Sequence, residues 1–301
     1  MDNLDRTLNN IKSLKIQGAE NISKCAVISL KEHMQNLRAI TKNSFLKELE
    51  IKKKKIIDAR PTEPCLRNCL NYISSNLEGN NLLALKKKFA QNTDEALNHI
   101  TESEKKIADI GSKLIPNRSV IFTHCHSSTV IAILKKAKES GKLFEVHNTE
   151  TRPMLQGRKT AKELSELGIP VVHYIDSAAR LALKKCDMAL FGCDAITTTK
   201  IYNKIGTEMF AEIAKKHETP VFFCADSWKM DPKSILGYPE AIEQRNQSEV
   251  WQNPPKGVKI SNYAFEKIDF ELATGIVSEL GVYKPEMFIE EVKLKYKNIF
   301  S

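Results

Sequence analysis

The stretch SVIFTHCHSS, residues Ser119–Ser128, joins a β-type run to a helical pattern. Its first residues, Ser119–Phe122, are typical of a short strand, and apolar residues recur at helical spacing from Val130 to Ala137. A strand, a tight polar turn and a helix place the turn at the carboxyl end of a strand, where α/β proteins bind ligands. The stretch therefore predicts an α/β fold with a site in the turn.

Cys125 is the first candidate for chemistry within this turn. Ser127 or Ser128 is placed to cap the following helix, whose first N–H groups attract anions. A cysteine just before that positive end is expected to have a lowered thiol pKa, which favours the thiolate. The alternative is a buried cysteine between two ordinary histidines, His124 and His126, and this segment alone leaves both interpretations open.

Composition bounds the class of protein. The chain has 301 residues and a hydrophobic fraction of 42%, as in soluble globular proteins. No apolar run approaches the ~18 residues of a membrane span, and no signal-peptide core is evident, so we expect a cytoplasmic protein without a membrane partner. Seven scattered cysteines indicate free thiols in a reducing compartment. Cys65 and Cys69 lack a second pair, so no metal site is expected.

The net charge of +9 is compatible with nucleic acid, anionic metabolites or a lysine-rich surface. The lysine runs Lys52–Lys55 and Lys86–Lys88 lie in helical patterns without interleaved aromatic residues, which favours solvated helix faces. Phosphorylated small molecules are therefore the expected partners, and nucleic acid is not.

Residues 1 to about 115 have helical patterns. Two prolines interrupt them at Arg60–Pro64, and Gly111–Arg118 is the expected domain boundary. We expect a helical domain, residues 1–115, followed by a second domain, residues 116–301. The expected helices are one through Leu14, then Asn21–Leu37, Ser44–Ala59, Cys65–Leu77 and Asn81–Lys113.

From Ser119 onward, short β-type runs alternate with helical patterns. This alternation predicts a Rossmann-like α/β domain with a doubly wound, mostly parallel sheet and helices on both faces. Neither a G-x-G-x-x-G nor a P-loop motif is present. The expected strands are Val120–Thr123, Leu143–His147, Pro170–Tyr174, Met188–Phe191, Val221–Cys224 and Val258–Ser261, and the expected helices are Ser128–Ser140, Arg158–Leu167, Ser177–Lys185 and Gly206–His217.

Polar groups follow four of these strands, and the carboxyl ends of parallel strands share one crevice. Arg152, Lys204, Lys229 and helix N-termini are expected to hold a phosphate-rich anionic ligand there. The polar segments are Thr123–Ser128, Thr149–Pro153 with Gln156-Gly157, Gly192–Thr197 leading to Asn203–Thr207, and Ala225–Lys229.

Asp194 is the best acid/base candidate. It follows a nearly apolar strand, and partial desolvation raises a carboxyl pKa toward the range useful for proton transfer. A helix or turn cap is the alternative role. If the strands that Cys125 and Asp194 follow converge, the two form a proton-transfer site. A Cys–His–Asp hydrolase lacks its nucleophile elbow here. In the helical domain, Arg60 and Gly18-Ala19 are further candidates for the crevice.

Four segments in this order resemble the superfamily of sugar-phosphate aldose–ketose isomerases and initiation factor 2B regulatory subunits. They are Thr123–Ser128, Glu150–Pro153 with Gln156-Gly157, Gly192-x-Asp194 and Asn203–Thr207. The resemblance extends from Ile16–Ala19 to Gly281, and within the superfamily the archaeal ribose-1,5-bisphosphate isomerases are the most similar group. It implies a homo-oligomer, either a dimer or a hexamer built from dimers.

The resemblance also implies roles. Cys125 would be the proton acceptor and Asp194 the proton donor. The reaction would convert ribose-1,5-bisphosphate to ribulose-1,5-bisphosphate through a phosphoenolate, in nucleoside-monophosphate degradation, without metal or nicotinamide cofactor. The substrate contacts it implies, together with the two side chains expected from the strand ends, are Gln17, Gly18, Ala19, Glu20, Arg60, Ser127, Ser128, Thr129, Arg152, Gln156, Asn203, Lys204 and Lys229.

The chain departs from the family pattern in the helical domain. Gln17 replaces the usual arginine of Arg-Gly-Ala, which removes a bidentate phosphate ligand, and Glu20 follows nearby. Two alternatives stay open. One is a regulatory subunit that senses a phosphorylated ligand without turnover. The other is methylthioribose-1-phosphate isomerase, which performs the same chemistry in a more apolar pocket than Ser127 and Ser128 suggest.

Overall fold

A computed structural model describes residues 3–39 and 41–296. The chain divides into two compact units, one that comprises the chain up to Glu102 together with Tyr296, and one that comprises Ser103–Lys295. The division falls within a long helix, α5 (Leu82–Leu114). The sequence-based boundary at residues 115/116 stays a prediction.

The first unit is helical, as expected. Two of its helices begin at start signals in the sequence: Thr41 and Ser44 form a reciprocal capping box at the start of α3, and Pro64 occupies the first turn of α4. Phe45 and Phe89 pack edge to face in its core, with ring centroids 5.8 Å apart. Besides α5, the helices are α1 (Asn3–Lys12), α2 (Ala19–Asn36), α3 (Lys42–Ala59) and α4 (Pro64–Ser74).

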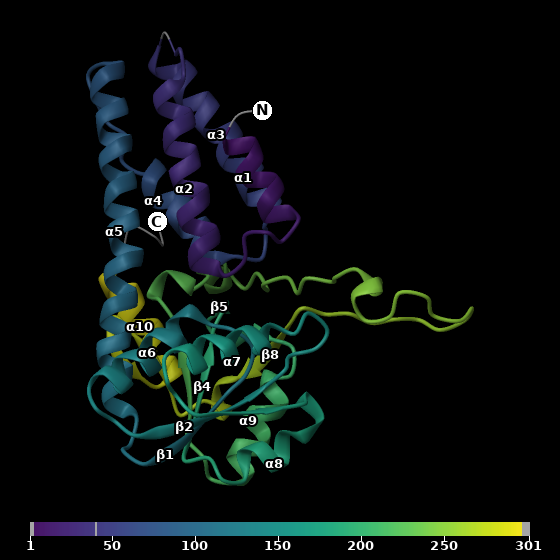
Figure 1. The fold of residues 1–301 in the computed structure, drawn as a ribbon. Helices are drawn as coiled ribbons and strands as arrows, with labels where there is room; N and C mark the ends of the chain where they lie inside the picture. The colour runs from purple at the N-terminus through teal and green to yellow at the C-terminus, as the bar shows by residue number, and fades with distance from the viewer. Residues whose placement is uncertain (1–2, 40, 297–301) are drawn as a thin grey trace. The chain divides into compact units, whose positions relative to one another are not determined.

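The second unit is built on a seven-stranded sheet of order β10-β9-β7-β4-β1-β2-β3 (Figure 1). Six strands are parallel, and β10 pairs antiparallel at the edge. The strands are β1 (Ser119–Thr123), β2 (Phe144–Thr149), β3 (Val171–Tyr174), β4 (Met188–Gly192), β7 (Val221–Cys224), β9 (Gly275–Ser278) and β10 (Gly281–Tyr283). This arrangement confirms the doubly wound, mostly parallel sheet.

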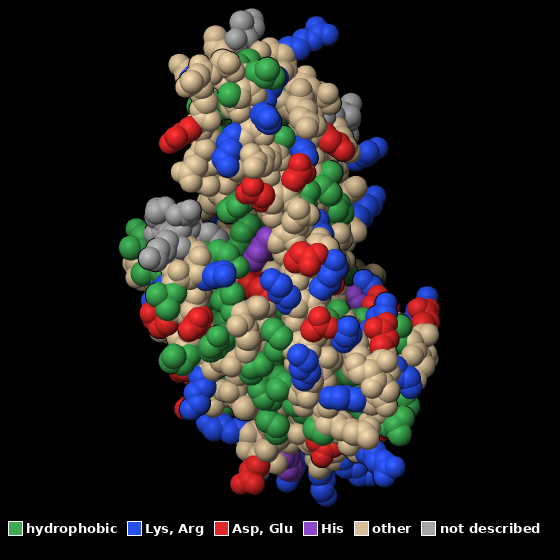
Figure 2. Space-filling model, turned by 90° about the vertical axis from the view of Figure 1, so that its left-hand side faces the viewer, with side chains coloured by type: hydrophobic (Ala, Val, Ile, Leu, Met, Phe, Trp, Pro, Cys, Tyr) green, Lys and Arg blue, Asp and Glu red, His purple; other side chains and the backbone are tan. Residues whose placement is uncertain are grey.

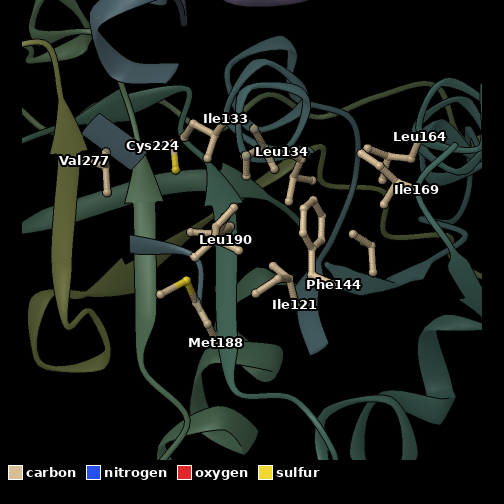
Figure 3. Packing of buried hydrophobic residues seen from close by; sticks show 14 of the residues in the cluster. Ile121, Ile133, Leu134, Phe144, Leu164, Ile169, Met188, Leu190, Cys224 and Val277 are labelled. Atoms are coloured by element: carbon tan, nitrogen blue, oxygen red, sulfur yellow. The ribbon is translucent and has the colours of Figure 1, made fainter. Parts of the chain in front are cut away.

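Helices cover both faces of this sheet. α6 (Ser128–Glu139) and α7 (Gln156–Glu166) pack against each other on one face, and α8 (Ala179–Leu183) and α9 (Thr207–Lys216) pack together on the other. The helix α10 (Pro285–Lys295) follows β10. Figure 3 shows the apolar core of the unit, in which Ile133 and Leu134 of α6 lie with the strand residues Ile121 and Leu190. The burial of this stripe explains why the 128–139 pattern forms a helix.

A second, three-stranded antiparallel sheet was not anticipated. It has the order β5-β6-β8, with β5 (Ala195–Ile196), β6 (Lys200–Lys204) and β8 (Phe265–Asp269). The expected strand Val258–Ser261 was wrong: these residues form no strand, and Val258 is 45% exposed. A β-type pattern becomes a strand only when a partner buries it, and β9 occupies the sheet position instead.

The remaining ordered segments are short. Between β7 and β8 the chain forms an extended segment, which projects from the unit in Figure 1. No helix among the described residues is long and apolar enough to span a bilayer. Single 3-10 turns are η1 (Asp176–Ala178), η2 (Ser227–Lys229), η3 (Pro232–Leu236), η4 (Gln247–Glu249) and η5 (Phe270–Leu272).

Candidate active site

β1 and β4 are neighbours at the point where the chain order of the sheet reverses. On one side of β1 the order runs to β2 and β3, and on the other side of β4 it runs to β7 and β9. Ile121 pairs with Met188 and Phe122 with Ala189, so the two strands end side by side. Loops that leave such a switch point in opposite directions open a ligand crevice. Cys125 follows β1 and Asp194 follows β4, so the two candidates follow neighbouring strands at this switch point.

Two threonine hydroxyls hold the backbone of Cys125. Its N–H donates to Oγ1 of Thr151 at 3.0 Å, and its carbonyl accepts from Oγ1 of Thr160 at 2.7 Å. These bonds support a left-handed conformation, φ 66°, that is unusual for a residue with a side chain. Cys125 as a whole residue is half-buried.

Gly192 allows the end of β4 to approach the turn after Cys125. A Cβ atom at Gly192 would lie 2.7 Å from Cβ of Ser127. Ser127 is the N-cap of α6 and accepts the N–H of Val130 at 3.4 Å. Ser128 is exposed at the first helical position, and Thr129 is buried behind it. The start of α6 is therefore built directly beside the end of β4, the strand that Asp194 follows.

The pKa of the Cys125 thiol is raised above its ordinary value, so the expectation of a lowered value was wrong. Burial is the largest cause, and the negative charges of Asp194 and Asp176 add to it. The positive charge of Lys204 and a hydrogen bond from the N–H of His126 act in the opposite direction. At this site, desolvation raises the thiol pKa by more than these two interactions lower it.

Lys204 and Asn203 come from β6, in the sheet that was not anticipated. The amide of Asn203 donates to Oγ1 of Thr207 at 3.0 Å, and the ammonium of Lys204 lies 5.1 Å from the ring centroid of Phe265. The N-terminus of α9 is already occupied, because the carboxylate of Glu266 accepts the N–H of Glu208 at 2.7 Å. This helix end is thus filled by a side chain.

Hydrogen bonds to Asp176 hold the loop after β2 in place. Its carboxylate accepts the N–H groups of Thr151 and Arg152, at 2.8 and 2.7 Å. The exposed guanidinium of Arg152 donates to the carbonyl of Val250 at 3.3 Å. Oε1 of Gln156 is buried and has no hydrogen-bond partner among the described residues. A hydrogen-bond donor on a ligand would satisfy this oxygen.

Lys229 is buried at the end of β7, within η2. Its charge lowers the pKa values of Cys193 and Cys224, although burial raises both overall, that of Cys224 to about 12. Cys193 stands between Gly192 and Asp194, so the Lys229 charge acts near the carboxyl end of β4. The role of Lys229 in binding phosphate stays a prediction.

The candidates of the helical unit are described within that unit. Gly18 caps α2 with a φ of 84°, and the amide of Gln17 donates to the carbonyl of Leu14 at 2.7 Å. Ala19 and Glu20 are buried in the first turn of α2. Arg60 ends α3 and pairs with Glu63 at 3.3 Å. Their contribution to a substrate site stays a prediction.

Sequence reasoning assigned no individual role to four residues that organise the site: Thr151, Thr160, Asp176 and His124. Thr151 and Asp176 left a signal, since each follows a parallel strand. The sequence carries no such signal for Thr160, because a threonine inside a helical pattern does not reveal which strand end its hydroxyl contacts.

The fold and the site define a class: a doubly wound α/β protein with a thiol and a carboxyl group at its switch point and lysines around them. The chain belongs to the initiation factor 2 subunit family, whose model matches residues 15–285.

Relatives with curated names cover nearly the whole chain. Ribose 1,5-bisphosphate isomerase of Pyrococcus furiosus is 34% identical over 304 residues, which cover 95% of this chain and 92% of that protein. The protein of the same name from Methanocaldococcus jannaschii is 34% identical over 289 residues, with 95% and 93% covered. Methylthioribose-1-phosphate isomerase of Pelotomaculum thermopropionicum is 32% identical over 295 residues, with 91% and 81% covered.

Solved structures have the same fold. The translation initiation factor eIF-2B of Pyrococcus horikoshii superposes with a TM-score of 0.84 at 25% identity, over 95% of this chain and 98% of that one. The 5-methylthioribose 1-phosphate isomerase of the same organism gives a TM-score of 0.79 at 25% identity, over 97% and 88%.

Proposed function

We propose that the protein is an aldose–ketose isomerase that converts ribose-1,5-bisphosphate to ribulose-1,5-bisphosphate. The observation that carries the proposal is the placement of Cys125 and Asp194 on adjacent strand ends, at the switch point. The similarity to ribose 1,5-bisphosphate isomerases supports this substrate over others.

Cys125 acts as the base and Asp194 as the acid. A phosphate on C1 locks the sugar as a ring, so no free aldehyde is available. Asp194 protonates the ring oxygen as the bond between that oxygen and C1 breaks, while the Cys125 thiolate takes the proton from C2. The product is an enol with phosphate still on C1. The thiol then returns the proton to C1, and Asp194 recovers a proton from the C2 hydroxyl, which becomes the ketone. Protons balance, and no external oxidant or reductant is required.

The polar start of α6 supports a bisphosphate. Ser127, Ser128 and Thr129 present hydroxyl and amide groups at a helix N-terminus, where anions bind. Lys204 and Lys229 supply positive charge, and Asn203 and the unpartnered Oε1 of Gln156 supply polar contacts for hydroxyl groups. A thioether in place of the second phosphate would offer these polar and positively charged groups no negative charge to bind.

The proposal includes a homo-oligomer. Hydrophobic side chains gather on the face of the second unit that carries α10 (Figure 2). Met287 and Leu294 lie on one side of α10 and are 54% and 67% exposed, and Val282 on the edge strand β10 is 38% exposed. Charging both helix positions, in Met287→Glu with Leu294→Glu, is expected to yield a lighter species in sedimentation velocity. The cytoplasm, where free thiols stay reduced, is the proposed location.

The test follows the phosphorus NMR spectrum of ribose-1,5-bisphosphate incubated with the protein. Conversion to ribulose-1,5-bisphosphate by the wild type is expected, with at least ~10³-fold slower conversion by Cys125→Ser and by Asp194→Asn. Methylthioribose-1-phosphate serves as the competing substrate. Turnover of that compound alone would replace the substrate assignment, and a protein that binds but converts neither compound would be a ligand sensor.

A further inference from the structure

His124 is buried at the end of β1 and connects three segments of the second unit. Its Nδ1 atom lies 2.6 Å from Oγ1 of Thr149 and 3.3 Å from Oγ1 of Thr151. Its Nε2 atom lies 2.9 Å from the carbonyl oxygen of Ile205. No step of the proposed reaction uses this imidazole, although it precedes Cys125 in the chain.

The hydrogen-bond partners assign the tautomer. A backbone carbonyl only accepts, so Nε2 carries the proton and donates to Ile205, and Nδ1 accepts from the hydroxyl of Thr149. The ring is neutral, because burial lowers the pKa of His124 to about 4. A neutral ring has one donor and one acceptor nitrogen. It can therefore bond to the Ile205 carbonyl and to a threonine hydroxyl without placing a charge in the interior.

The bond to Ile205 reaches the turn that directly follows Lys204, the last residue of β6. This turn is tight against the ring: a Cβ atom at Gly206 would lie 3.3 Å from Nε2 of His124, and the φ of 99° there favours glycine. Glu266 accepts the N–H of Glu208, just after the same turn. The turn is thus held by one side chain that follows β1 and by one from β8.

We propose that His124 is a positioning residue that fixes, through the carbonyl of Ile205, the end of β6 that carries Lys204. The inference deepens the proposed function, since it names what keeps the base near a stabilising charge. Burial and the negative charges of Asp194 and Asp176 destabilise the thiolate form of Cys125. The positive charge of Lys204 stabilises it. A shift of the turn would remove that support.

The experiment measures the thiol pKa of Cys125 without any substrate. Alkylation by iodoacetamide is followed against pH in a Cys25→Ser background, because the other five cysteines are buried. His124→Gln keeps an amide donor near the Nε2 position, whereas His124→Asn reaches only the Nδ1 position. We expect the Asn variant to raise the thiol pKa by about one unit and the Gln variant to stay close to the wild type.

Lys204→Gln provides the matched control. It is expected to raise the thiol pKa as His124→Asn does, and the double variant is expected to add little to either. A folded His124→Asn protein with the wild-type thiol pKa would overturn the proposal, as would full additivity with Lys204→Gln. Should the Asn variant fail to fold, ¹⁵N spectra of the wild-type imidazole decide: a proton on Nδ1 contradicts the assignment. Because no substrate is used, these outcomes are independent of the isomerase activity.

Discussion

The amide of Cys125 donates to Oγ1 of Thr151, and both residues have left-handed backbones, with φ angles of 66° and 64°. Such conformations cost about 1 kcal/mol or more each for residues with a side chain. They persist because the surroundings hold them: Thr151 in turn donates its own N–H to Asp176. Hydrogen bonds with neighbouring side chains thus fix the backbone that carries the thiol. Each of these side chains can be replaced by mutation separately.

Thr151→Val is expected to leave the N–H of Cys125 without an acceptor. The free energy of unfolding should fall by about 1–3 kcal/mol, because a partly buried donor loses its partner. The turnover number should fall with it, since the thiol loses its fixed place. Thr151→Ser keeps the hydroxyl and serves as the control. Denaturant unfolding and steady-state kinetics measure both effects, and equal losses in the two variants would show that the methyl group matters instead.

Iodoacetamide is expected to inactivate the enzyme through Cys125. The pKa of this thiol is raised, and the thiolate is the reactive form, so the inactivation rate should rise about tenfold per pH unit and still be rising at pH 9. Substrate should slow the reaction. Cys25→Ser should inactivate like the wild type, and a rate that levels off near pH 7 would contradict the raised pKa.

Acid should destabilise the second unit through His124. The unfolded histidine titrates near 6.5 and the folded one near 4, so between these values the unfolded state binds more protons. Stability is therefore complete above about pH 6.5 and is lost as pH falls toward 4, by about 2 kcal/mol between pH 7 and pH 5. Urea unfolding at both pH values measures the loss. His124→Gln should reduce it, and the same loss in that variant would assign it to other groups.

Gly157→Ala is expected to destabilise the second unit by about 3 kcal/mol or more. The new Cβ would lie 1.7 Å from the carbonyl oxygen of Thr149, a backbone atom that cannot rotate away. The first turn of α7 would have to leave the end of β2. Gly168→Asn is the matched control, because nothing lies near a Cβ there and asparagine tolerates its φ of 68°. Thermal unfolding compares the two, and similar melting temperatures would contradict the close packing at Gly157.

Gly192→Ala is expected to affect catalysis more than folding. Its Cβ would meet Ser127 at 2.7 Å and displace the turn that begins α6. A rise in KM for a phosphorylated substrate, of roughly tenfold, is expected with a fold that circular dichroism finds intact. Unchanged KM and kcat would show that Ser127 has room to move and that the start of α6 does not bind the substrate.

The sequence predicted the parallel sheet because each strand is short, apolar and followed by a helical pattern. Five of the six expected strands match β1, β2, β3, β4 and β7. The second sheet escaped prediction because β6 carries the polar side chains Lys200 and Asn203 and pairs with β8, which lies far along the chain. Pairing over such a distance leaves no local pattern.

The candidate site was predictable in location more than in detail. Parallel strand ends gave the positions of Cys125, Asp194 and Lys229. The pKa of Cys125 was not predictable, because it depends on burial by segments distant in sequence. The filling of the α9 N-terminus by Glu266 has the same origin: only the paired β6 and β8 bring that carboxylate to the helix.

The neighbouring strands β1 and β4 carry the proposed catalytic pair, while β2 and β3 lie between them in sequence and outside them in the sheet. During synthesis, Cys125 therefore emerges well before its partner strand exists. A nascent or truncated chain that ends before β4 has a thiol but no acid, and cannot complete the reaction. Activity should arise abruptly, when the central strand pair closes, so that the onset of turnover reports on a late, long-range step of folding.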